Sequence, residues 1–411
     1  MKSKRTSRFI LNLLGMGTAV ALLGDATLYT VLPHPDISAQ LGITLSMVGL
    51  LLGANRAVRL ILNGPVGVLY DRLPRRGLLI SALALGAVSS VFYAIGYGFW
   101  LLLIGRIFWG LAWSILWIGG STVVLDVSTE ENRGQHSGIY QMWFVIGVAT
   151  SSFSGALLTD MFGFRISQWI SVAVIAATAL AWFFFLPETR ANEAAGEISV
   201  SEIKKPPKLD LPWNVIATTS MAIFATRFLA WGVLAATSIL WLSDLFGEGL
   251  LISALFIPIA TLTGLYSALS NLTSIVTTPL AGSISDKLGR RWPVIGLATI
   301  IGGLGLWLMS GDIRSLALVG AFLVPIAGSS TETLIPAIAG DCVPKNMRSR
   351  ALGLINTAGD LGATIGPFAA LAALNAGWLS LGGIYQIGGV LFGLMALLAF
   401  SPLTARKFRT Q

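Results

Sequence analysis

Seven ionisable side chains lie inside long apolar stretches of this sequence. They are three acids and four arginines, namely Asp25, Arg56, Arg59, Arg106, Arg227, Glu332 and Asp360. A charge in an apolar environment is costly without a partner, so such residues are candidates for a functional site. An arginine close to an acid lowers the pKa of the acid, and burial without that partner raises it. An acid that moves between these two environments can therefore release and take up a proton. Arginines in excess over acids favour an anionic or a neutral amphiphilic ligand.

Polar residues around three of these charges have the spacing of single helix faces. At ~100° per residue, Asn55, Arg56, Arg59 and Asn63 fall within an arc of about 100°. The same spacing recurs in two further sets, which are Ser270, Asn271, Ser274 and Thr278, and Asn356, Thr357, Asp360 and Thr364. We expect these stripes to face a central aqueous cavity that binds a substrate.

Trp109, Trp113 and Trp117 are spaced four residues apart and share a helix face with Arg106. A packing stripe that faces lipid is the simpler interpretation. The shared arginine favours the cavity wall, where indoles could stack on a planar or lipophilic substrate and hold the guanidinium by cation–π attraction. Trp143 is expected in the same wall.

A ten-residue segment occurs twice. Gly67-Val-Leu-Tyr-Asp71-Arg72-Leu-Pro-Arg75-Arg76 returns, displaced by 215 positions, as Gly282-Ser-Ile-Ser-Asp286-Lys287-Leu-Gly-Arg290-Arg291. The same offset relates Asp126 to Asp341 and Arg133 to Arg348. Such a period indicates two similar halves.

The repeated segment has the residue types of a latch. Its glycines permit close helix approach, its aspartates can accept hydrogen bonds from a helix N-terminus, and its arginines can donate to carboxylates across the seam between the halves. The alternative is that the basic residues only fix membrane topology. The residues of the expected cytoplasmic gate are Gly67, Asp71, Arg72, Arg75, Asp126, Arg133, Gly282, Asp286, Lys287, Arg290, Asp341 and Arg348.

The composition indicates which elements carry these residues. Of the 411 residues, 55% are hydrophobic and 11% charged, and the mean hydropathy is +0.78. This is too little polar surface for a soluble globule, so the chain is expected to lie in lipid. Twelve apolar stretches are long enough to span a bilayer: 9–32, 43–69, 77–97, 99–125, 138–159, 166–187, 213–242, 257–284, 292–310, 315–339, 351–375 and 379–402. The basic start of the chain resembles a secretory signal, but the long run behind it favours a retained first helix.

The fold class predicted is an all-α membrane protein of two six-helix bundles. The expected domains are an N-terminal bundle over 1–188, a linker over 189–212 and a C-terminal bundle over 213–411. Of the 27 Lys and Arg residues, 21 fall on the side of the two termini. Because basic loops stay in the cytoplasm, both termini are expected there, in the cell membrane. The net charge of +8 is then explained by topology and anionic lipid headgroups, and a nucleic-acid partner is not expected.

The duplicated loop, which follows the second span of each half, resembles the signature loop of the major facilitator superfamily. Arg106-x-x-x-Gly110 resembles the second motif of that family, and Pro187-Glu188-Thr189 resembles its usual exit from the sixth span. The chain departs from the pattern at Pro74, at Trp109, and in the fifth span, which lacks the Gly-Pro pair of drug antiporters. The resemblance covers essentially the whole chain.

The resemblance implies roles for several of the buried charges. In similar transporters, an acid in the first span and an arginine in the fourth often couple protons, and this carries over onto Asp25 and Arg106. A permanent structural salt bridge is the alternative for that pair. The second and eleventh helices of the family adjoin, so an Arg59–Asp360 bridge could form in one state and break in another. Glu332 is expected to be a second proton site or a cytoplasmic gate. For Arg227 two partners remain open, a substrate anion and Glu332.

Other chemistries have little support in the sequence. One cysteine, Cys342, and two separated histidines, His34 and His136, offer no disulfide and no metal-ligand cluster. No ATP-binding loop is present, so the expected energy source is a proton gradient, without a cofactor, and the protein is not expected to be an enzyme.

The function predicted is that of a proton-coupled secondary transporter, working as a monomer in membrane lipid. It would move a small organic solute, anionic or amphiphilic, by alternating access. A multidrug or cation efflux antiporter is the first alternative, and a non-transporting membrane receptor is the second.

Overall fold

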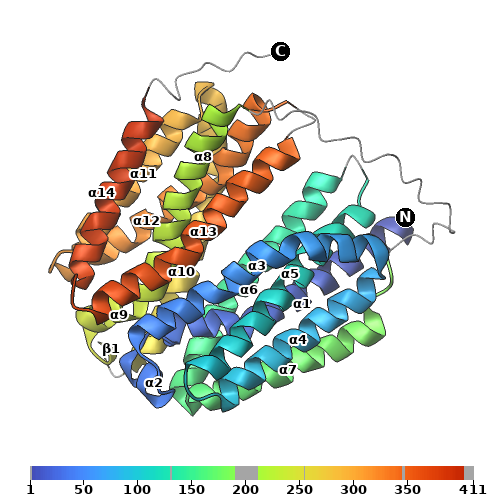
Figure 1. Ribbon diagram of the computed structural model, residues 1–411, viewed down its shortest axis with the longest axis horizontal. Helices are drawn as coiled ribbons and strands as arrows, with labels where there is room; N and C mark the ends of the chain where they lie inside the picture. Colours follow the sequence, from blue (N-terminus) through green and yellow to red (C-terminus); the bar gives the residue numbers. More distant parts are fainter. Residues whose placement is uncertain (1, 130–131, 190–211, 254, 345–347, 402–411) are drawn as a thin grey trace.

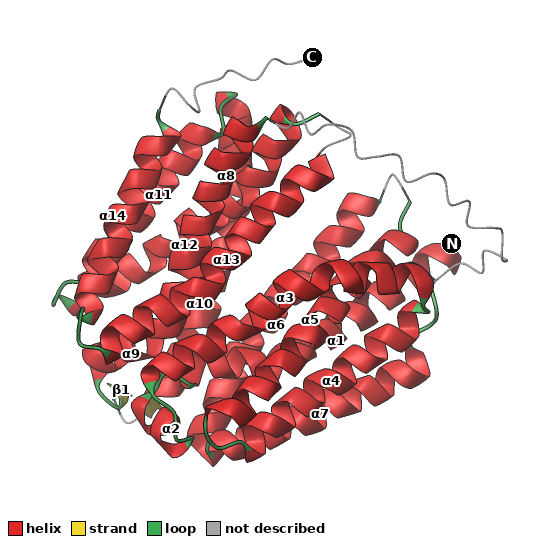
Figure 2. Ribbon diagram, in the orientation of Figure 1, coloured by secondary structure: helices red, strands yellow, loops and turns green. Residues whose placement is uncertain are grey.

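The computed structural model describes residues 2–129, 132–189, 212–253, 255–344 and 348–401. These residues are almost entirely helical (Figure 2). The first half contains α1 (Lys2–Val31), α2 (Pro35–Gln40), α3 (Leu45–Arg72), α4 (Arg75–Ile95), α5 (Phe99–Asp126), α6 (Arg133–Phe162) and α7 (Phe164–Phe185). The second half contains α8 (Trp213–Thr226), η1 (Arg227–Leu234), α9 (Ala235–Phe246), β1 (Gly249–Ile252), β2 (Leu255–Pro258), α10 (Ile259–Leu288), α11 (Trp292–Met309), α12 (Arg314–Cys342), α13 (Arg348–Asn375) and α14 (Leu381–Ala399).

Twelve helices of the described chain are long and apolar enough to cross a membrane. Six of them precede residue 186 and six follow residue 212, counting α8, η1 and α9 as one span. An α-helix satisfies all of its own backbone hydrogen bonds, which is why apolar segments of this length adopt it in lipid. The predicted all-α, twelve-span membrane fold is confirmed.

The helices of each half pack mainly on one another, and two pairs join the halves (Figure 1). In these two main pairs, α3 packs along α13 and α6 packs along α10, and α1 makes smaller contacts with α9 and α10. We call the end of the bundle that carries the two repeated loops, after α3 and α10, the motif face. The opposite end, where α1 ends and α3 begins, is the distal face.

Glycines show that the two faces differ in how closely the halves approach. A Cβ on Gly53 would lie 2.3 Å from the carbonyl oxygen of Thr364, and one on Gly264 would lie 2.7 Å from that of Ser152. Both contacts cross between the halves toward the distal face. By contrast, a Cβ on Gly67, Gly282 or Gly353 would meet nothing within 4 Å. The halves therefore touch at the distal face and leave room at the motif face.

The buried apolar residues form two clusters. One lies within the first half and includes Leu79, Trp113 and Trp182. The other fills the second half and also takes in distal-face residues of the first half, among them Val31 and Leu51. The shared cluster explains why the distal contacts hold the halves together.

Two features of the second half were not expected from the sequence. Its first span contains the π-helix η1, which begins at Arg227. A short antiparallel hairpin, β1 with β2, precedes α10 on the distal side. π-Helices are rare and often mark functional positions, because the wider turn redirects side chains.

Candidate functional site

Asp25 of α1 and Arg106 of α5 form an ion pair within the first half. The Arg106 side chain is 1% exposed, whereas that of Asp25 is 13% exposed. Arg106 also donates from Nε to the carbonyl of Leu51 at 2.8 Å and from Nη2 to that of Leu52 at 3.3 Å. Arg106 is thus held on α3 whether or not Asp25 is bound to it. Of the two side chains, only Asp25 can leave the pair without leaving its partner unbonded.

Arg227 organises the ionic cluster of the second half. Its Nε and Nη2 donate to the two carboxylate oxygens of Glu332 at 2.6 and 3.0 Å, and its Nη1 donates to Asp360 at 2.9 Å. Nη2 also donates to Asn356 Oδ1 at 3.0 Å. Position 227 is the first residue of η1, so the π-helical segment begins where α12 and α13 converge on this guanidinium. Of the two partners that the sequence left open for Arg227, the structure provides Glu332.

Arg59 of α3 connects this cluster to the first half. Its Nη2 lies 3.9 Å from Asp360 Oδ2, which is the outer limit for an ion pair. Asp360 therefore faces one arginine from each half. This is the pair that the resemblance implied, and the distance marks it as the weaker of the two contacts of Asp360.

Arg56 has aromatic neighbours. Its Nε lies 3.4 Å from the Tyr29 hydroxyl, and its guanidinium lies 5.8 Å from the Tyr29 ring centroid and 5.5 Å from that of Trp231. At 1.5 Å of rise per residue, the sequence predicts similar depths in the membrane for Arg56, Asp25 and Arg106, and therefore a cluster of the three. The Arg106 guanidinium lies 5.4 Å from the same Tyr29 ring centroid, so Arg56 lies near that ion pair without bonding to it, and it also contacts an indole of the opposite half.

The tryptophan stripe of α5 is placed differently from the expectation. Trp109 and Trp113 are 3% and 6% exposed, stack on each other with ring centroids 5.8 Å apart, and belong to the core of the first half. Trp117 packs against Tyr140 and Phe144. In this conformation both side chains lie in the core and not on a cavity wall, because Trp109 packs against Gly86 of α4 and Trp113 packs against Phe144 of α6. Trp143 packs over Gly15 and donates to Asn12 Oδ1 at 3.2 Å.

The remaining polar residues of the predicted cavity differ in exposure. Asn356 is exposed and holds Arg227. Asn55 is buried beside the Tyr29 hydroxyl. Asn271 donates to the carbonyl of Ser267 on its own helix at 2.8 Å. Of the three stripes, those of α3 and α13 therefore join the ionic cluster, whereas that of α10 makes no hydrogen bond or ion pair with it among the described side chains.

The arginines of the repeated loops pair within each half and not across the seam. Arg75 donates to Asp126 at 3.3 Å, and Arg291 donates to Asp341 at 2.6 Å. Each pair joins the start of one helix to the end of another in the same half, so the expectation of bonds across the seam is wrong for these two pairs. Asp286, whose side chain is 69% exposed, contacts Arg291.

The other gate residues are placed as follows. Lys287 and Arg290 are exposed, and Arg348 donates to the carbonyl of Val343 at 3.2 Å. The side chains of Asp71 and Arg133 lie outside the part of the chain whose side chains are described, and α3 ends at Arg72. A carboxylate at a helix N-terminus does occur here, but it is that of Glu188, which accepts from the backbone N–H groups of Arg75 and Arg76 at 3.0 and 3.1 Å.

A second carboxylate at a helix N-terminus joins the halves at the distal face. Asp160, near the end of α6, accepts from the backbone N–H and the hydroxyl of Thr261 at 2.6 and 2.5 Å. Thr261 lies in the first turn of α10, where the helix dipole favours an anion. This contact has the chemistry expected for the Asp71 and Asp286 latch, at the opposite face of the molecule.

Sequence reasoning missed four residues of these clusters: Tyr29, Asp160, Trp231 and Thr261. Two of them carried a usable signal. Tyr29 follows Asp25 by four residues, and Trp231 follows Arg227 by four, so each aromatic ring shares a helix face with a buried charge. Asp160 was counted as a loop residue because it follows the expected end of its span by one position.

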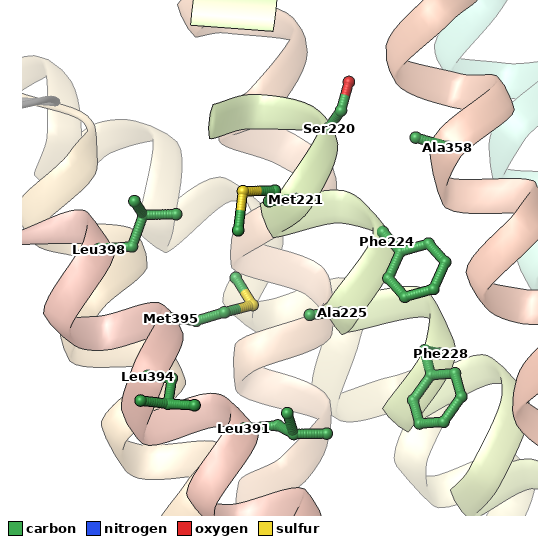
Figure 3. Close-up of a pocket in the computed structure, with 10 residues that line it drawn as sticks. All are labelled: Ser220, Met221, Phe224, Ala225, Phe228, Ala358, Leu391, Leu394, Met395 and Leu398. Atoms are coloured by element: carbon green, nitrogen blue, oxygen red, sulfur yellow. The ribbon is translucent and has the colours of Figure 1, made fainter. Parts of the chain in front are cut away.

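A separate apolar pocket of about 530 Å³ lies between α8 with η1, α13 and α14 (Figure 3). Phe224, Phe228, Met221, Met395 and Leu391 are among its lining residues. None of the ionisable residues described above lines it. It is a hydrophobic groove beside the ionic cluster and not part of it.

Comparisons with known proteins agree with this architecture. A family model described as Major Facilitator Superfamily matches residues 14–271 and 260–410. An uncharacterized MFS-type transporter of Methanocaldococcus jannaschii is 23% identical over 82% of this chain and 84% of its own length. The inner membrane transport protein YajR of Escherichia coli is 24% identical over 86% of this chain and 75% of its own length.

Solved structures extend the likeness to the whole fold. A bacterial homolog of the human lysosomal transporter Spinster, in an inward-facing and occupied conformation, superposes with a TM-score of 0.74. The match covers 98% of this chain and 97% of that chain, at 16% identity. At this identity the likeness concerns the fold alone.

Proposed function

Since this chain belongs to the Major Facilitator Superfamily, we propose that it is a proton-coupled secondary transporter that moves a small organic solute by alternating access. The observation that carries the proposal is a set of largely buried ionisable side chains inside the two six-helix halves and at the boundary between them. Among them, Asp360 faces Arg227 of its own half and Arg59 of the other. The halves touch at one face and have room at the other, which suits a carrier open on one side.

Asp25 is the proton site in this proposal. Arg106 keeps two backbone carbonyl acceptors on α3 when Asp25 takes up a proton and turns away, so the guanidinium is never left without partners. The 13% exposure of Asp25 gives it access to water that the buried arginine lacks. Glu332 serves as the second acid. Because Arg227 donates to both Glu332 and Asp360, a change in the charge of one acid alters the environment of the other.

Asp25→Asn tests this role. We expect the variant to lose solute accumulation driven by an imposed pH gradient in proteoliposomes and to retain counterflow exchange, since exchange needs no net proton movement. Asp36→Asn is the matched control, because the Asp36 side chain is 92% exposed on a distal loop. Accumulation that is unchanged in Asp25→Asn rejects the proton role.

We place the motif face, with both termini, in the cytoplasm. The argument is the excess of Lys and Arg in the loops on that side of the chain. Cysteine labelling checks the orientation, since Cys342 ends α12 at the motif face and Trp378 follows α13 at the distal face. An impermeant maleimide should label Trp378→Cys from outside intact cells and reach Cys342 only after permeabilisation, and the reverse pattern would invert the topology.

Efflux of organic cations receives less support. A cation carrier needs a membrane acid free of basic partners. Asp25 pairs with Arg106, Glu332 with Arg227, and Asp360 with both Arg227 and Arg59. None of these three acids is left over for a cationic solute.

A further inference from the structure

The buried charges do not cancel. Asp25 neutralises Arg106, while Glu332 and Asp360 face Arg227 and Arg59. The remaining charge is that of Arg56, which lies within 4.0 Å of no carboxylate among the described residues. Its charge also repels Arg59. One positive charge is thus left at the boundary between the halves.

The protein contacts of Arg56 leave most of its hydrogen-bonding capacity unused. A guanidinium has five N–H donors. In the described structure only Nε has a partner, the Tyr29 hydroxyl at 3.4 Å, and that hydroxyl itself donates to the carbonyl of Leu52 at 2.5 Å. The aromatic faces of Tyr29 and Trp231 attract the cation but accept none of its in-plane donors. The two Nη atoms, which form the fork that grips a carboxylate, are therefore available.

Trp231 provides a surface beside that fork. Its indole is 40% exposed and lies 5.5 Å from the guanidinium of Arg56 and 5.9 Å from that of Arg227. The ring belongs to the second half and Arg56 to the first, so a ligand between them touches both halves. An exposed aromatic ring next to an unneutralised cation suits a ligand with an anionic head and a planar or apolar body.

We infer that the transported solute is a small organic monoanion, whose acidic group binds Arg56 and whose body lies against Trp231. This inference rests on the transport function proposed above. One negative charge neutralises the cluster, and contact with both halves gives the ligand different affinities for the two conformations, as coupling requires.

Binding to the purified full-length protein tests the inference without any gradient. The probes are phenylacetate, indole-acetate and octanoate, each with its amide and its amine analogue, and inorganic phosphate. We expect at least one acid to raise the unfolding temperature and its neutral and cationic analogues to have no effect. Equal or greater stabilisation by the amides, the amines or phosphate, or none by any acid, overturns the assignment.

Variants locate the binding site. Arg56→Gln should weaken the binding of the acid, measured by calorimetry, by about a hundredfold or more, and Arg56→Lys by about tenfold, because lysine keeps the charge without the fork. Trp231→Ala should weaken phenylacetate by about tenfold. Arg8→Gln, at an exposed position of α1, is the matched control and should bind normally. Full affinity in a folded Arg56→Gln or Arg56→Lys protein contradicts the site.

The binding assay and the transport assay fail separately. Acid-selective binding that depends on Arg56, without accumulation driven by a pH gradient, would reject proton-coupled transport and retain the anion site. Gradient-driven accumulation of a neutral or cationic solute would retain transport and reject the monoanion.

Discussion

The two arginines at the centres of the ionic clusters depend on their acids to different degrees. Arg106 has two backbone carbonyl acceptors in addition to Asp25. Arg227 relies on side chains alone, and it separates two carboxylates, Glu332 and Asp360. Removing Arg227 therefore leaves two like charges facing each other at a site largely closed to water.

Arg227→Gln should lower the stability of the protein more than Glu332→Gln does. Loss of the arginine leaves Glu332 without a basic partner and Asp360 with only its longer contact to Arg59, whereas loss of Glu332 leaves Arg227 with Asp360. We expect a cost of about 2 kcal/mol, which is below the value for fully buried pairs because the Glu332 side chain is 26% exposed. Thermal unfolding of the purified variants measures the difference.

The double variant Arg227→Gln with Glu332→Gln serves as the control. It removes one charge of each sign, so it should recover much of the stability lost in Arg227→Gln alone. If the double variant is less stable by the sum of the two single effects, charge repulsion is not the cause.

At the scale of elements, the N-terminus of α10 is bound by a carboxylate from the other half. Asp160 of α6 accepts two hydrogen bonds from Thr261 in the first turn of α10. A carboxylate is stabilising at this end of a helix because it faces unpaired N–H groups and the positive end of the dipole. Opening the distal face must break this contact.

Asp160→Ala should shift the population toward a conformation open at the distal face. Loss of the charge and of both hydrogen bonds should change the ratio of conformations by about tenfold. Distances between spin labels at Trp100→Cys and Trp378→Cys, in a Cys342→Ser background, measure the shift, since these exposed residues lie at the distal ends of the two halves. Asp36→Asn should leave the distribution unchanged, and an unchanged distribution in Asp160→Ala shows that the bond does not hold the face closed.

At the scale of the whole molecule, two glycines of α3 should act in opposite directions. A Cβ at Gly53 would lie 2.3 Å from the Thr364 carbonyl oxygen of the other half, whereas one at Gly67 meets nothing within 4 Å. Gly53→Ala should therefore disfavour the present conformation. Gly67→Ala should leave it intact and disfavour the alternative in which the motif face closes.

The same pair of spin labels distinguishes the two variants. We expect longer distances in Gly53→Ala, and in Gly67→Ala distances as short as in the parent or shorter. Helix propensity predicts a gain in stability of about 1 kcal/mol for both changes, so each is the control for the other. A shift of the same sign in both would show that propensity, and not contact between the halves, is responsible.

The sequence predicted the twelve spans well because apolar length is a strong and local signal. The ends of the spans at Gly98 and Gly163 follow from glycines with positive φ, and those near Thr44 and Ser380 follow from side chains that cap helix N-termini. None of these signals requires knowledge of distant parts of the chain.

The pairing of charges was only partly predictable, because it depends on helix rotation and neighbours. The family resemblance paired Asp25 with Arg106 and Arg59 with Asp360. It could not show that Arg56 turns toward Trp231, since the π-helical segment that orients this indole leaves no clear trace in composition. The stripe of Trp109, Trp113 and Trp117 was expected on the cavity wall, but Trp109 and Trp113 lie in the core of the first half. Residue spacing identifies a helix face but not the elements that cover it.

Because the halves share an apolar cluster at the distal face, temperature should change the population of a conformation in which that face is open. Parting the halves at the distal face wets residues such as Val31 and Leu51, which that cluster now keeps dry. Wetting hydrocarbon raises the heat capacity and becomes less unfavourable in the cold. Cooling should therefore favour a conformation that is open at the distal face, and the enthalpy difference between that conformation and the present one should change with temperature.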